Sequence, residues 1–410
     1  MTRLRELVRD GDVCFVSTGG GEPRLLLREL VREVAPYRDN LGFLQVLTGS
    51  AGELLRVADY GHTISTPVPA GLVGAGGAPG VRLLDDSMRQ CAAAIASGVQ
   101  RLDGVLLTVR RSGDRLYPFP AVDLAMVAFE RARFRAVEVI ADGPAAPRGP
   151  CFPVGDVDYL VDAEEPPAGL AAQPEDDASV LIGARVAELV PPDAVIELGV
   201  GRALASVAGA LVAAGRPLAV HTGLVSDWTR TLVDGGVVTR PLDCAGGGSV
   251  IGTIALGSAS FHDWLAATDA VTLAESRHAQ DPLHLGGLSP FVAVNSAPVV
   301  ELTGQVGLPS GVRDGPGSGG LLDFAVAGAY GGLSIIAVPA VSSTGRSRLV
   351  PRLSTVHLPS SLVTHVVTEY GAADLRGRTA AERREQLIAI AHPDHRDRLR
   401  RDEENGGERG

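Results

Sequence analysis

Lysine is absent from the 410-residue sequence, so all 37 basic residues are arginines. Without lysine the chain cannot form a Schiff base, hold pyridoxal phosphate covalently or build a Walker-type phosphate loop. Asparagine occurs only at Asn40, Asn295 and Asn405, and with the excess of Arg, Ala, Gly and Val this indicates a GC-rich, bacterial genome. The net charge of −11 argues against nucleic acid or an anionic membrane as a partner.

Cysteine is also scarce, and no C-x-x-C pair is present. A disulfide framework or a thiolate metal site is therefore not expected, and a reducing cytoplasm is the simplest setting. The histidines do not show the spacing of metal ligands, so we expect no metal site. The four cysteines lie far apart in the sequence: Cys14, Cys91, Cys151 and Cys244.

Long hydrophobic runs are missing as well. The most apolar stretch, Ala203–Val220, is interrupted by glycine, arginine and proline, whereas a membrane span needs about 20 apolar residues. Residues 1–10 are charged throughout, unlike the apolar centre of a signal peptide. We therefore expect a soluble, cytoplasmic protein that does not contact a membrane.

The apolar pattern that is present predicts alternating strands and helices. Val13–Ser17 reads as a strand, followed by a glycine turn and a helical pattern over Pro23–Val34. The same order recurs later, with Ala194–Leu198 as the strand and Ala203–Ala214 as the helix. This repetition suggests an internal duplication. The predicted fold is α/β, with two related domains whose sheets are largely parallel.

The best candidate linker is residues 166–177, which are rich in Pro, Ala and acids. We therefore predict an N-terminal domain at 1–165, a C-terminal domain at 178–397 and a solvated, flexible tail at 398–410. Asp177 could cap the first helix of the second domain, whose core face would contain Val180, Ala184 and Ala187.

The second domain supplies most of the candidate site residues. Strands are predicted at Pro217–His221, Ser334–Val341 and His365–Thr368. Ligands of open α/β sheets bind at the carboxyl ends of the strands, where His221 and Glu369 would lie.

A glycine-rich segment, Gly315–Phe324, is the densest motif of the sequence. Its glycines, among them Gly317, Gly319 and Gly320, allow close approach of the backbone, so that N–H groups can face an anion or a developing oxyanion. Among the carboxylates near apolar or glycine-rich sequence, Glu275 follows the apolar stretch Ala270–Ala274 and is the best candidate for a catalytic acid, base or nucleophile. The others are Glu197, Glu301, Asp323 and Glu369.

Taken in order, the C-terminal motifs resemble the acetyl-CoA hydrolase/acyl-CoA:carboxylate CoA-transferase family. The resemblance covers about residues 178–397, whereas the N-terminal half matches weakly, mainly at Gly11-Asp12 and the glycine turn before Pro23. The motifs that carry it include Gly199-Val200-Gly201, His221-Thr222-Gly223, Asn295-Ser296-Ala297, Gly317-Ser318-Gly319-Gly320, Ser347-Arg348, Thr368-Glu369-Tyr370-Gly371 and Ala391-His392-Pro393.

This resemblance implies two related α/β domains with the site between them, a homodimer, and acyl-CoA and a small carboxylic acid as substrates without a tightly bound cofactor. In that family a glutamate attacks the acyl-CoA thioester, and a glutamyl-CoA thioester then passes CoA to a second acid. The glycine-rich loop would contact the oxyanion and CoA. The residues that the resemblance assigns to binding are Gly199, Gly201, Asn295, Gly317, Gly319, Gly320, Ser347 and Arg348.

The sequence departs from the family at the catalytic position. An ungapped alignment anchored on Asp281-Pro282 and Asn295 places Arg277 where the glutamate would stand, and Glu275 lies two residues upstream. The acid expected after His221-Thr222 is replaced by Gly223.

Three hypotheses remain open. In the first, Glu275 is the nucleophile of a CoA-transferase. In the second, the chain is a divergent acyltransferase or thioesterase in which water, an amine or an alcohol attacks the acyl-CoA directly. His278 or Glu369 would then be the base, and Arg277 would hold an acceptor carboxylate. In the third, the chain is a non-catalytic homologue that binds acyl-CoA.

Overall fold

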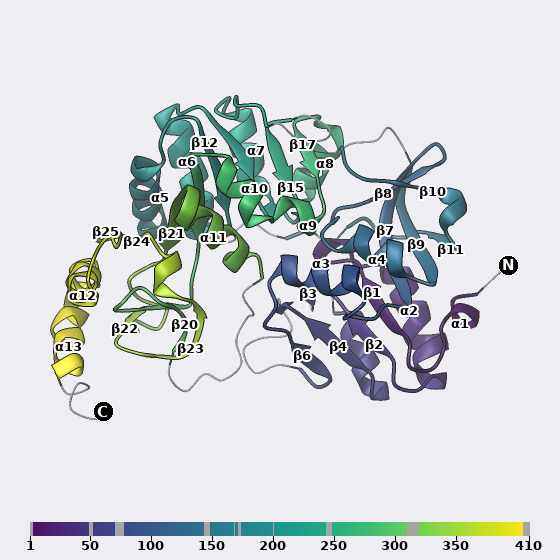
Figure 1. Cartoon of the computed structure of the whole chain (residues 1–410). Helices are drawn as coiled ribbons and strands as arrows, with labels where there is room; N and C mark the ends of the chain where they lie inside the picture. The colour runs from purple at the N-terminus through teal and green to yellow at the C-terminus, as the bar shows by residue number, and fades with distance from the viewer. Residues whose placement is uncertain are drawn as a thin grey trace.

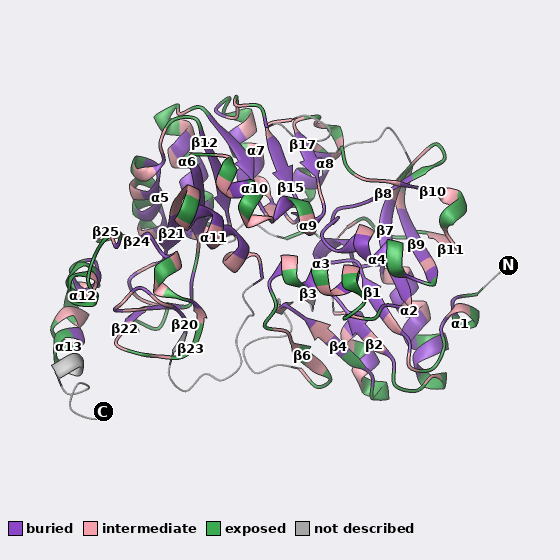
Figure 2. Cartoon of the chain, viewed as in Figure 1, coloured by how far each residue is buried: buried purple, intermediate pink, exposed green. Residues whose placement is uncertain are grey.

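The computed structural model describes residues 3–48, 52–69, 78–142, 148–167, 169–170, 174–199, 201–242, 248–309 and 319–404. Two α/β units lie side by side, with the N-terminal unit in purple and blue and the C-terminal unit in teal to yellow (Figure 1). The central strands of both units are buried, strands at the margins are partly exposed, and many exposed residues lie on the outer faces of the helices (Figure 2). The expected mixed α/β fold with largely parallel sheets is confirmed.

The N-terminal sheet has a parallel core in the order β6-β4-β2-β1-β7-β9-β11. Two antiparallel strands, β8 (Arg115–Pro118) and β10 (Phe152–Pro153), extend it at β7. The parallel strands are β1 (Val13–Val16), β2 (Gly42–Leu44), β4 (Thr63–Thr66), β6 (Val81–Leu83), β7 (Gly104–Ser112), β9 (Phe134–Asp142) and β11 (Tyr159–Asp162). The helices are α1 (Leu4–Leu7), α2 (Arg24–Glu29), α3 (Met88–Ser97) and α4 (Ala125–Arg131).

The C-terminal sheet has a parallel core in the order β17-β15-β13-β12-β18-β21-β24, with β25 (Gly371–Asp374) antiparallel at its edge. The parallel strands are β12 (Ala194–Leu198), β13 (Leu218–His221), β15 (Val250–Gly252), β17 (Val271–Leu273), β18 (Phe291–Asn295), β21 (Gly332–Ala337) and β24 (His365–Thr368). The helices are α5 (Asp177–Leu189), α6 (Arg202–Ala214), α7 (Asp227–Asp234), α8 (Ala259–Ala267), α9 (Ser276–Ala279), α10 (Pro282–Gly287), α11 (Leu321–Gly331), α12 (Ala380–Ala389) and α13 (Pro393–Glu404).

Three smaller sheets complete the fold. Two of them are pairs of short parallel strands that continue strands of the main sheets: β3 (Leu47–Thr48) with β5 (Val68–Pro69), and β14 (Leu224–Val225) with β16 (Ile254–Ala255). The third has the order β22-β19-β20-β23 and covers one end of the C-terminal unit: β22 (Leu349–Val350), β19 (Val299–Glu301), β20 (Val306–Pro309) and β23 (Leu353–Leu358).

The expected duplication is visible in the strand order. Within the described residues both sheets contain seven parallel strands in the same order, so that β1 corresponds to β12, β2 to β13, β4 to β15 and β6 to β17. The pair β3–β5 corresponds to the pair β14–β16 in the same way. Equivalent threonines end two of the strands: the Thr66 hydroxyl donates to the Val46 carbonyl, and the Thr253 hydroxyl donates to the Gly223 carbonyl.

Helix α5 corrects one local prediction. Its N-cap is Asp176, whose side chain accepts a hydrogen bond from the Ser179 N–H, and Asp177 is already the first helical residue. The buried face contains Ile182 and Val186, whereas Val180 of the predicted core face is half exposed. Ala184 is exposed as well, and Ala187 alone of the predicted face is buried. The bulkier apolar residues Ile182 and Val186 pack into the core cluster of the C-terminal unit.

The C-terminal end corrects a second prediction. Residues 398–404, expected to begin a flexible tail, are the last turns of α13, which starts at Pro393. Leu399 is buried against the same cluster as Leu387 and Ala391 of the preceding helix region. A single apolar residue in a charged run therefore anchors the helix. The proposed linker lies between β11 and α5.

Candidate active site

The two units meet through the segments that follow the carboxyl ends of their strands. The Val122 N–H donates to the Thr253 carbonyl (2.8 Å), and the Ser276 N–H donates to the Asp123 carbonyl (2.9 Å). Helices α3 and α9, which follow the equivalent strands β6 and β17, pack against each other at this junction (Figure 1). Since ligands bind at carboxyl ends of parallel strands, the junction is the candidate active site.

Glu275 lies at this junction as the N-cap residue of α9, two residues after β17 ends. Its side chain is 9% exposed and forms an ion pair with Arg277, in which Oε2 and Nε are 2.7 Å apart. Burial raises the pKa of Glu275, while the Arg277 charge opposes this shift. The site therefore contains a carboxylate that is desolvated but still has a cationic partner.

Arg277 also contacts the other unit. Its Nη2 donates to Oε1 of Glu130 on α4 (3.0 Å), so the guanidinium bridges Glu275 and Glu130. Sequence reasoning missed Glu130, because 147 residues separate it from Arg277 and no motif marks it. His278, the other predicted residue of this segment, is exposed.

The described part of the glycine-rich motif also lies against the N-terminal unit. Gly319 has a φ of 51° and its carbonyl accepts a hydrogen bond from the Met88 N–H (3.2 Å). On α11, Asp323 accepts hydrogen bonds from the Ser87 hydroxyl (2.8 Å) and the Arg89 N–H (3.2 Å). Asp323 thus caps α3 across the junction, and burial raises its pKa to about 6. Gly317 lies outside the described residues.

A second group of predicted residues gathers where β12 and β18 end. The Asn295 amide donates from Nδ2 to Oε2 of Glu197 (2.8 Å), and a Cβ at position 199 would lie 3.1 Å from Oδ1 of Asn295. Glu197 is 2% exposed, and burial raises its pKa to about 8. Gly201 is exposed at the start of α6 with a φ of 131°, a conformation that favours glycine.

The third group lies further along the row of strand carboxyl ends, beyond β18. Oε2 of Glu369 accepts a hydrogen bond from the Ala340 N–H (2.8 Å), and the Ala340 carbonyl accepts from the Arg348 N–H (2.9 Å). The Ser347 hydroxyl donates to the Leu349 carbonyl (2.7 Å), within its own loop. Arg348 reaches toward Asn295 through a hydrogen bond from Nη1 to the Ala297 carbonyl (3.3 Å).

These three groups do not form one compact cluster. Adjacent strands are about 4.8 Å apart, so residues at the ends of β17 and β24, six strand positions apart, are separated by about 29 Å. By this spacing Glu369 and Glu275 belong to different groups of residues. Asn295, four positions from β17, lies about 19 Å along the edge from Glu275. An extended ligand that lies along the carboxyl ends of the strands could contact both Glu275 and Asn295.

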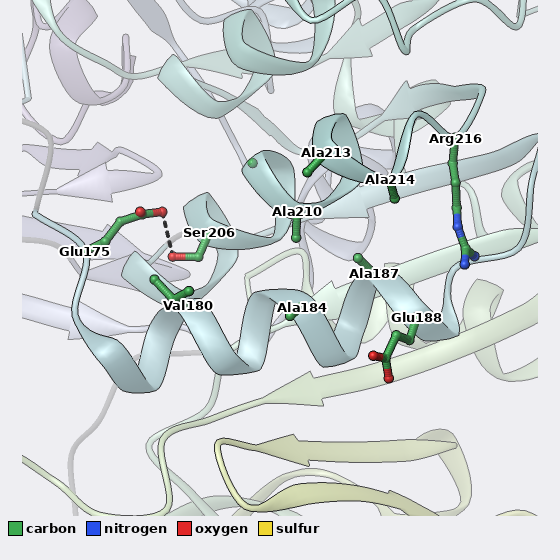
Figure 3. Close-up of a pocket in the computed structure, with 11 residues that line it drawn as sticks. Glu175, Val180, Ala184, Ala187, Glu188, Ser206, Ala210, Ala213, Ala214 and Arg216 are labelled. Atoms are coloured by element: carbon green, nitrogen blue, oxygen red, sulfur yellow. Dashed lines mark hydrogen bonds between the residues drawn. The ribbon is translucent and has the colours of Figure 1, made fainter.

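A pocket of about 460 Å³ lies elsewhere, between α5 and α6 on the outer face (Figure 3). Small side chains such as Ala184 and Ala210 line it, with Glu188 and Arg216 at one end. It includes none of the predicted site residues. In the described ranges, no three His, Cys, Asp or Glu residues are grouped so that they could hold a metal ion. Across the same ranges, no helix combines the length and apolarity needed to cross a membrane.

The fold is shared with solved structures. RipA from Yersinia pestis matches with a TM-score of 0.87 and 24% identity, over 99% of this chain and 97% of that one. A 4-hydroxybutyrate CoA-transferase from Porphyromonas gingivalis matches with a TM-score of 0.80 and 22% identity, over 98% and 95% of the two chains. The two sheets, with the carboxyl ends of their strands meeting at the junction, thus have the two-domain CoA-transferase fold.

Sequence comparisons give the family. Residues 257–403 match the acetyl-CoA hydrolase/transferase C-terminal domain. The 4-hydroxybutyrate coenzyme A transferase of Clostridium kluyveri is 32% identical over 285 residues, which span 68% of this chain and 66% of that protein. The succinyl-CoA:cyclohexane-1-carboxylate CoA transferase of Geobacter metallireducens is 32% identical over 290 residues, 68% of this chain and 65% of that protein. This chain belongs to the acetyl-CoA hydrolase/CoA-transferase family, and its alignments span just under two thirds of these relatives' lengths.

Proposed function

We propose that this protein transfers CoA between carboxylic acids, with Glu275 as the covalent nucleophile. The observation that carries the proposal is the placement of Glu275: a buried carboxylate at the carboxyl end of β17, where the two units meet. The named relatives, which are CoA transferases, support the same chemistry.

In the proposed reaction an oxygen of Glu275 attacks the thioester carbon of the acyl-CoA, and the carbon–sulfur bond breaks. This step gives a mixed anhydride and the CoA thiolate. The thiolate then attacks the Glu275 acyl carbon and expels the first carboxylic acid as its carboxylate, leaving a glutamyl-CoA thioester. The acceptor carboxylate repeats the two steps in reverse order, and Glu275 is regenerated.

The residues around Glu275 have separate tasks in this proposal. Arg277 keeps the buried carboxylate ionised, because its charge opposes the effect of burial on the Glu275 pKa. Glu130 offers Arg277 a second partner, so the guanidinium can release Glu275 when it attacks. The N–H groups at Gly319 and Gly320 would face the developing oxyanion, and Asn295 and Arg348 would contact the CoA further along the edge.

The alternative is direct transfer of the acyl group to water, an amine or an alcohol. The observation that favours it is the double restraint on the nucleophile, since Glu275 is tied to Arg277 and Arg277 is tied to Glu130. In this alternative Arg277 holds an acceptor carboxylate and Glu275 is never acylated.

Peptide mass spectrometry after incubation with a panel of acyl-CoAs separates the two. Covalent transfer leaves a CoA-mass adduct on the peptide that contains Glu275, and the adduct is absent from Glu275→Gln. Glu301→Gln is the matched control, because Glu301 accepts a hydrogen bond from the Thr303 N–H in its own turn (2.8 Å). Release of CoA without an adduct on any carboxylate favours direct transfer. Absence of CoA release and of acyl-CoA binding supports a non-catalytic homologue and contradicts the proposal.

We further propose that the protein is a bacterial, cytoplasmic homodimer that binds acyl-CoA only as a substrate. The domains would be residues 1–165 and 178–397, joined by the linker 166–177. Light scattering after gel filtration tests the dimer, and limited proteolysis tests the linker, since exposed Pro- and Ala-rich segments are cut first.

A further inference from the structure

A small buried site at the end of β13 has hydrogen-bonding capacity that the described residues do not use. His221 ends this strand and is 2% exposed. Its Nε2 lies 2.8 Å from the Ala279 carbonyl. A carbonyl oxygen only accepts hydrogen bonds, so Nε2 must carry the hydrogen. In the neutral imidazole Nδ1 then presents a bare lone pair.

That lone pair has no hydrogen-bond partner among the described residues, although Nδ1 is buried. Burial lowers the pKa of His221 to about 4, so the ring is neutral at physiological pH. A base this weak accepts a hydrogen bond without taking the proton. His221 is therefore suited to orienting a donor rather than to deprotonating one.

Gln280, one residue beyond Ala279, supplies a second acceptor. It is 2% exposed, and its Oε1 likewise lacks a partner within the described ranges. Its amide lies against two glycines: a Cβ at position 223 would come within 2.8 Å of Nε2, and one at position 320 within 3.4 Å. The absence of side chains at both positions leaves room for this amide.

The walls of the site come from elements that the proposed function already uses. The Phe324 ring would lie 3.1 Å from a Cβ at either Gly223 or Gly320, so it closes one side. Gly320, within the glycine-rich motif, is the N-cap of α11. The site is thus partly aromatic, with the His284 ring 6.0 Å from the His221 ring, and it lies two strand positions from β17, about 10 Å along the carboxyl ends of the strands.

We propose that His221 and Gln280 form a subsite for a neutral hydrogen-bond donor of a substrate, an amide N–H or an alcohol O–H. The two unpartnered atoms, Nδ1 of His221 and Oε1 of Gln280, both accept hydrogen bonds, so a ligand that satisfies them must bring hydrogens. The donor has two sources: the amides of the pantetheine arm of CoA, or a hydroxyl or amide of the second substrate. The identity of the ligand, but not the existence of the subsite, rests on the proposed function.

The test is the nitrogen NMR spectrum of protein labelled with ¹⁵N-histidine, with the His221 signals assigned through His221→Gln. We expect Nε2 protonated and Nδ1 unprotonated in the free protein. The probes are CoA, pantetheine, adenosine 3′,5′-bisphosphate, and panels of hydroxy acids and acid amides. A shift of Nδ1 with CoA and pantetheine but not with the bisphosphate assigns the donor to the pantetheine arm. A shift only with hydroxy acids or acid amides assigns it to the second substrate.

Variants at position 280 sharpen the test. Gln280→Leu removes the acceptor and should weaken the effective probe at least 10-fold, whereas Gln280→Glu keeps an acceptor and should retain most of the affinity. Gln100→Leu, in a loop of the N-terminal unit, is the matched control, and thermal unfolding identifies a variant that has lost its fold.

Two results overturn the proposal. One is a protonated Nδ1 in the free protein. The other is an Nδ1 signal that no probe moves, including the case in which it is already hydrogen-bonded to a fixed water. Neither depends on turnover. Loss of the Glu275 adduct with an intact Nδ1 response would reject the proposed function and leave the subsite standing.

Discussion

The two sheets have the same strand order but different chemistry where their strands end. One of the buried acids of the N-terminal unit is Glu22, which follows the turn after β1 and accepts a hydrogen bond from Gln45 (3.0 Å). The buried acids of the C-terminal unit include Glu197, within strand β12, which accepts a hydrogen bond from Asn295. Apolar strands and short crossovers fix the order in both, while the segments after the strands are free to diverge.

The equivalent strands β6 and β17 show what this divergence produces. After β6 the chain forms α3, whose N-terminus is capped by Ser87 and, across the junction, by Asp323. After β17 it forms the four-residue α9, headed by Glu275. The segment after β6 therefore stabilises the junction, whereas the segment after β17 provides the candidate nucleophile. The comparison predicts that Glu275, which follows β17, affects catalysis, whereas Glu22, which follows β1, affects stability alone.

The largest expected effect separates Glu275 from Glu22. Glu275→Gln should lower CoA exchange by about 10³-fold or more, because a side-chain amide cannot form the covalent intermediate. Glu22→Gln should leave the rate within about 3-fold, since its partner Gln45 is a structural amide of the other sheet. Steady-state exchange with a pair of carboxylic acids measures both. Equal losses of exchange rate in the two variants would contradict this division between Glu275 and Glu22.

The second prediction concerns the pH dependence of stability. Burial raises the pKa of Glu197 to about 8 and that of Glu22 to about 7, both from 4.5 in the unfolded chain. The folded state therefore favours the protonated acids. Each stabilising contribution is complete below about pH 4.5 and is lost as pH rises, by up to about 5 kcal/mol at pH 8 for Glu197 and about 3 kcal/mol at pH 7 for Glu22.

Urea unfolding at pH 5, 7 and 8.5 measures these losses. Glu197→Gln should remove the fall in unfolding free energy between pH 7 and 8.5, whereas Glu22→Gln should flatten only the range below pH 7. The wild-type chain is the reference for both. A Glu197→Gln protein that still loses stability above pH 7 as steeply as the wild type would show that another group titrates there.

A smaller effect is expected at the junction itself. Asp323→Ala removes two hydrogen bonds that cap α3 across the domains and should cost about 2 kcal/mol of unfolding free energy. Asp234→Ala is the matched control, since its ion pair with Arg230 (3.1 Å) is exposed and worth about 1 kcal/mol or less. Urea midpoints at pH 7 compare them. If the two losses are equal, the buried cap has no special role at the junction.

Sequence alone could predict much of this architecture. Strands such as Ala194–Leu198 and His365–Thr368 are found at the predicted residues, because fully buried strands read as short apolar runs between turns. The duplication was visible from the repeated strand, glycine turn and helix. The face of α5 was wrong, since alanines and valines on both sides leave the helical pattern ambiguous and only the packing partner decides.

The candidate site was less predictable. Glu275 was a candidate because it follows an apolar stretch, and Arg277 because of the alignment that the family resemblance provides. Glu130 lies in the other unit, and its contact with Arg277 exists only once the two units pack. Gln280 was missed for a different reason: a glutamine between Ala279 and Asp281 belongs to no motif, and only the structure shows that it is buried and that its Oε1 lacks a partner among the described residues. The tasks of Glu369 and Ser347 remain predictions, and in this structure both bond to nearby backbone.

The smallest predicted effect tests whether the junction tunes the nucleophile. The negative charge of Glu130 raises the pKa of Glu275, while Arg277 lowers it. In Glu130→Gln the guanidinium keeps only Glu275 as an ionised partner, so the pKa of Glu275 should fall. Because the ionised form is the nucleophile, the acid limb of the pH–rate profile should move to lower pH by a few tenths of a unit. The rate at neutral pH should fall by about 2- to 5-fold, since a carboxylate held by one cation attacks less readily. Glu29→Gln, an acid of the same unit bonded to the Tyr159 hydroxyl (2.9 Å), should change neither quantity. A profile that moves to higher pH would contradict this prediction and would mean that Glu130 stabilises the ionised form of Glu275 by positioning Arg277.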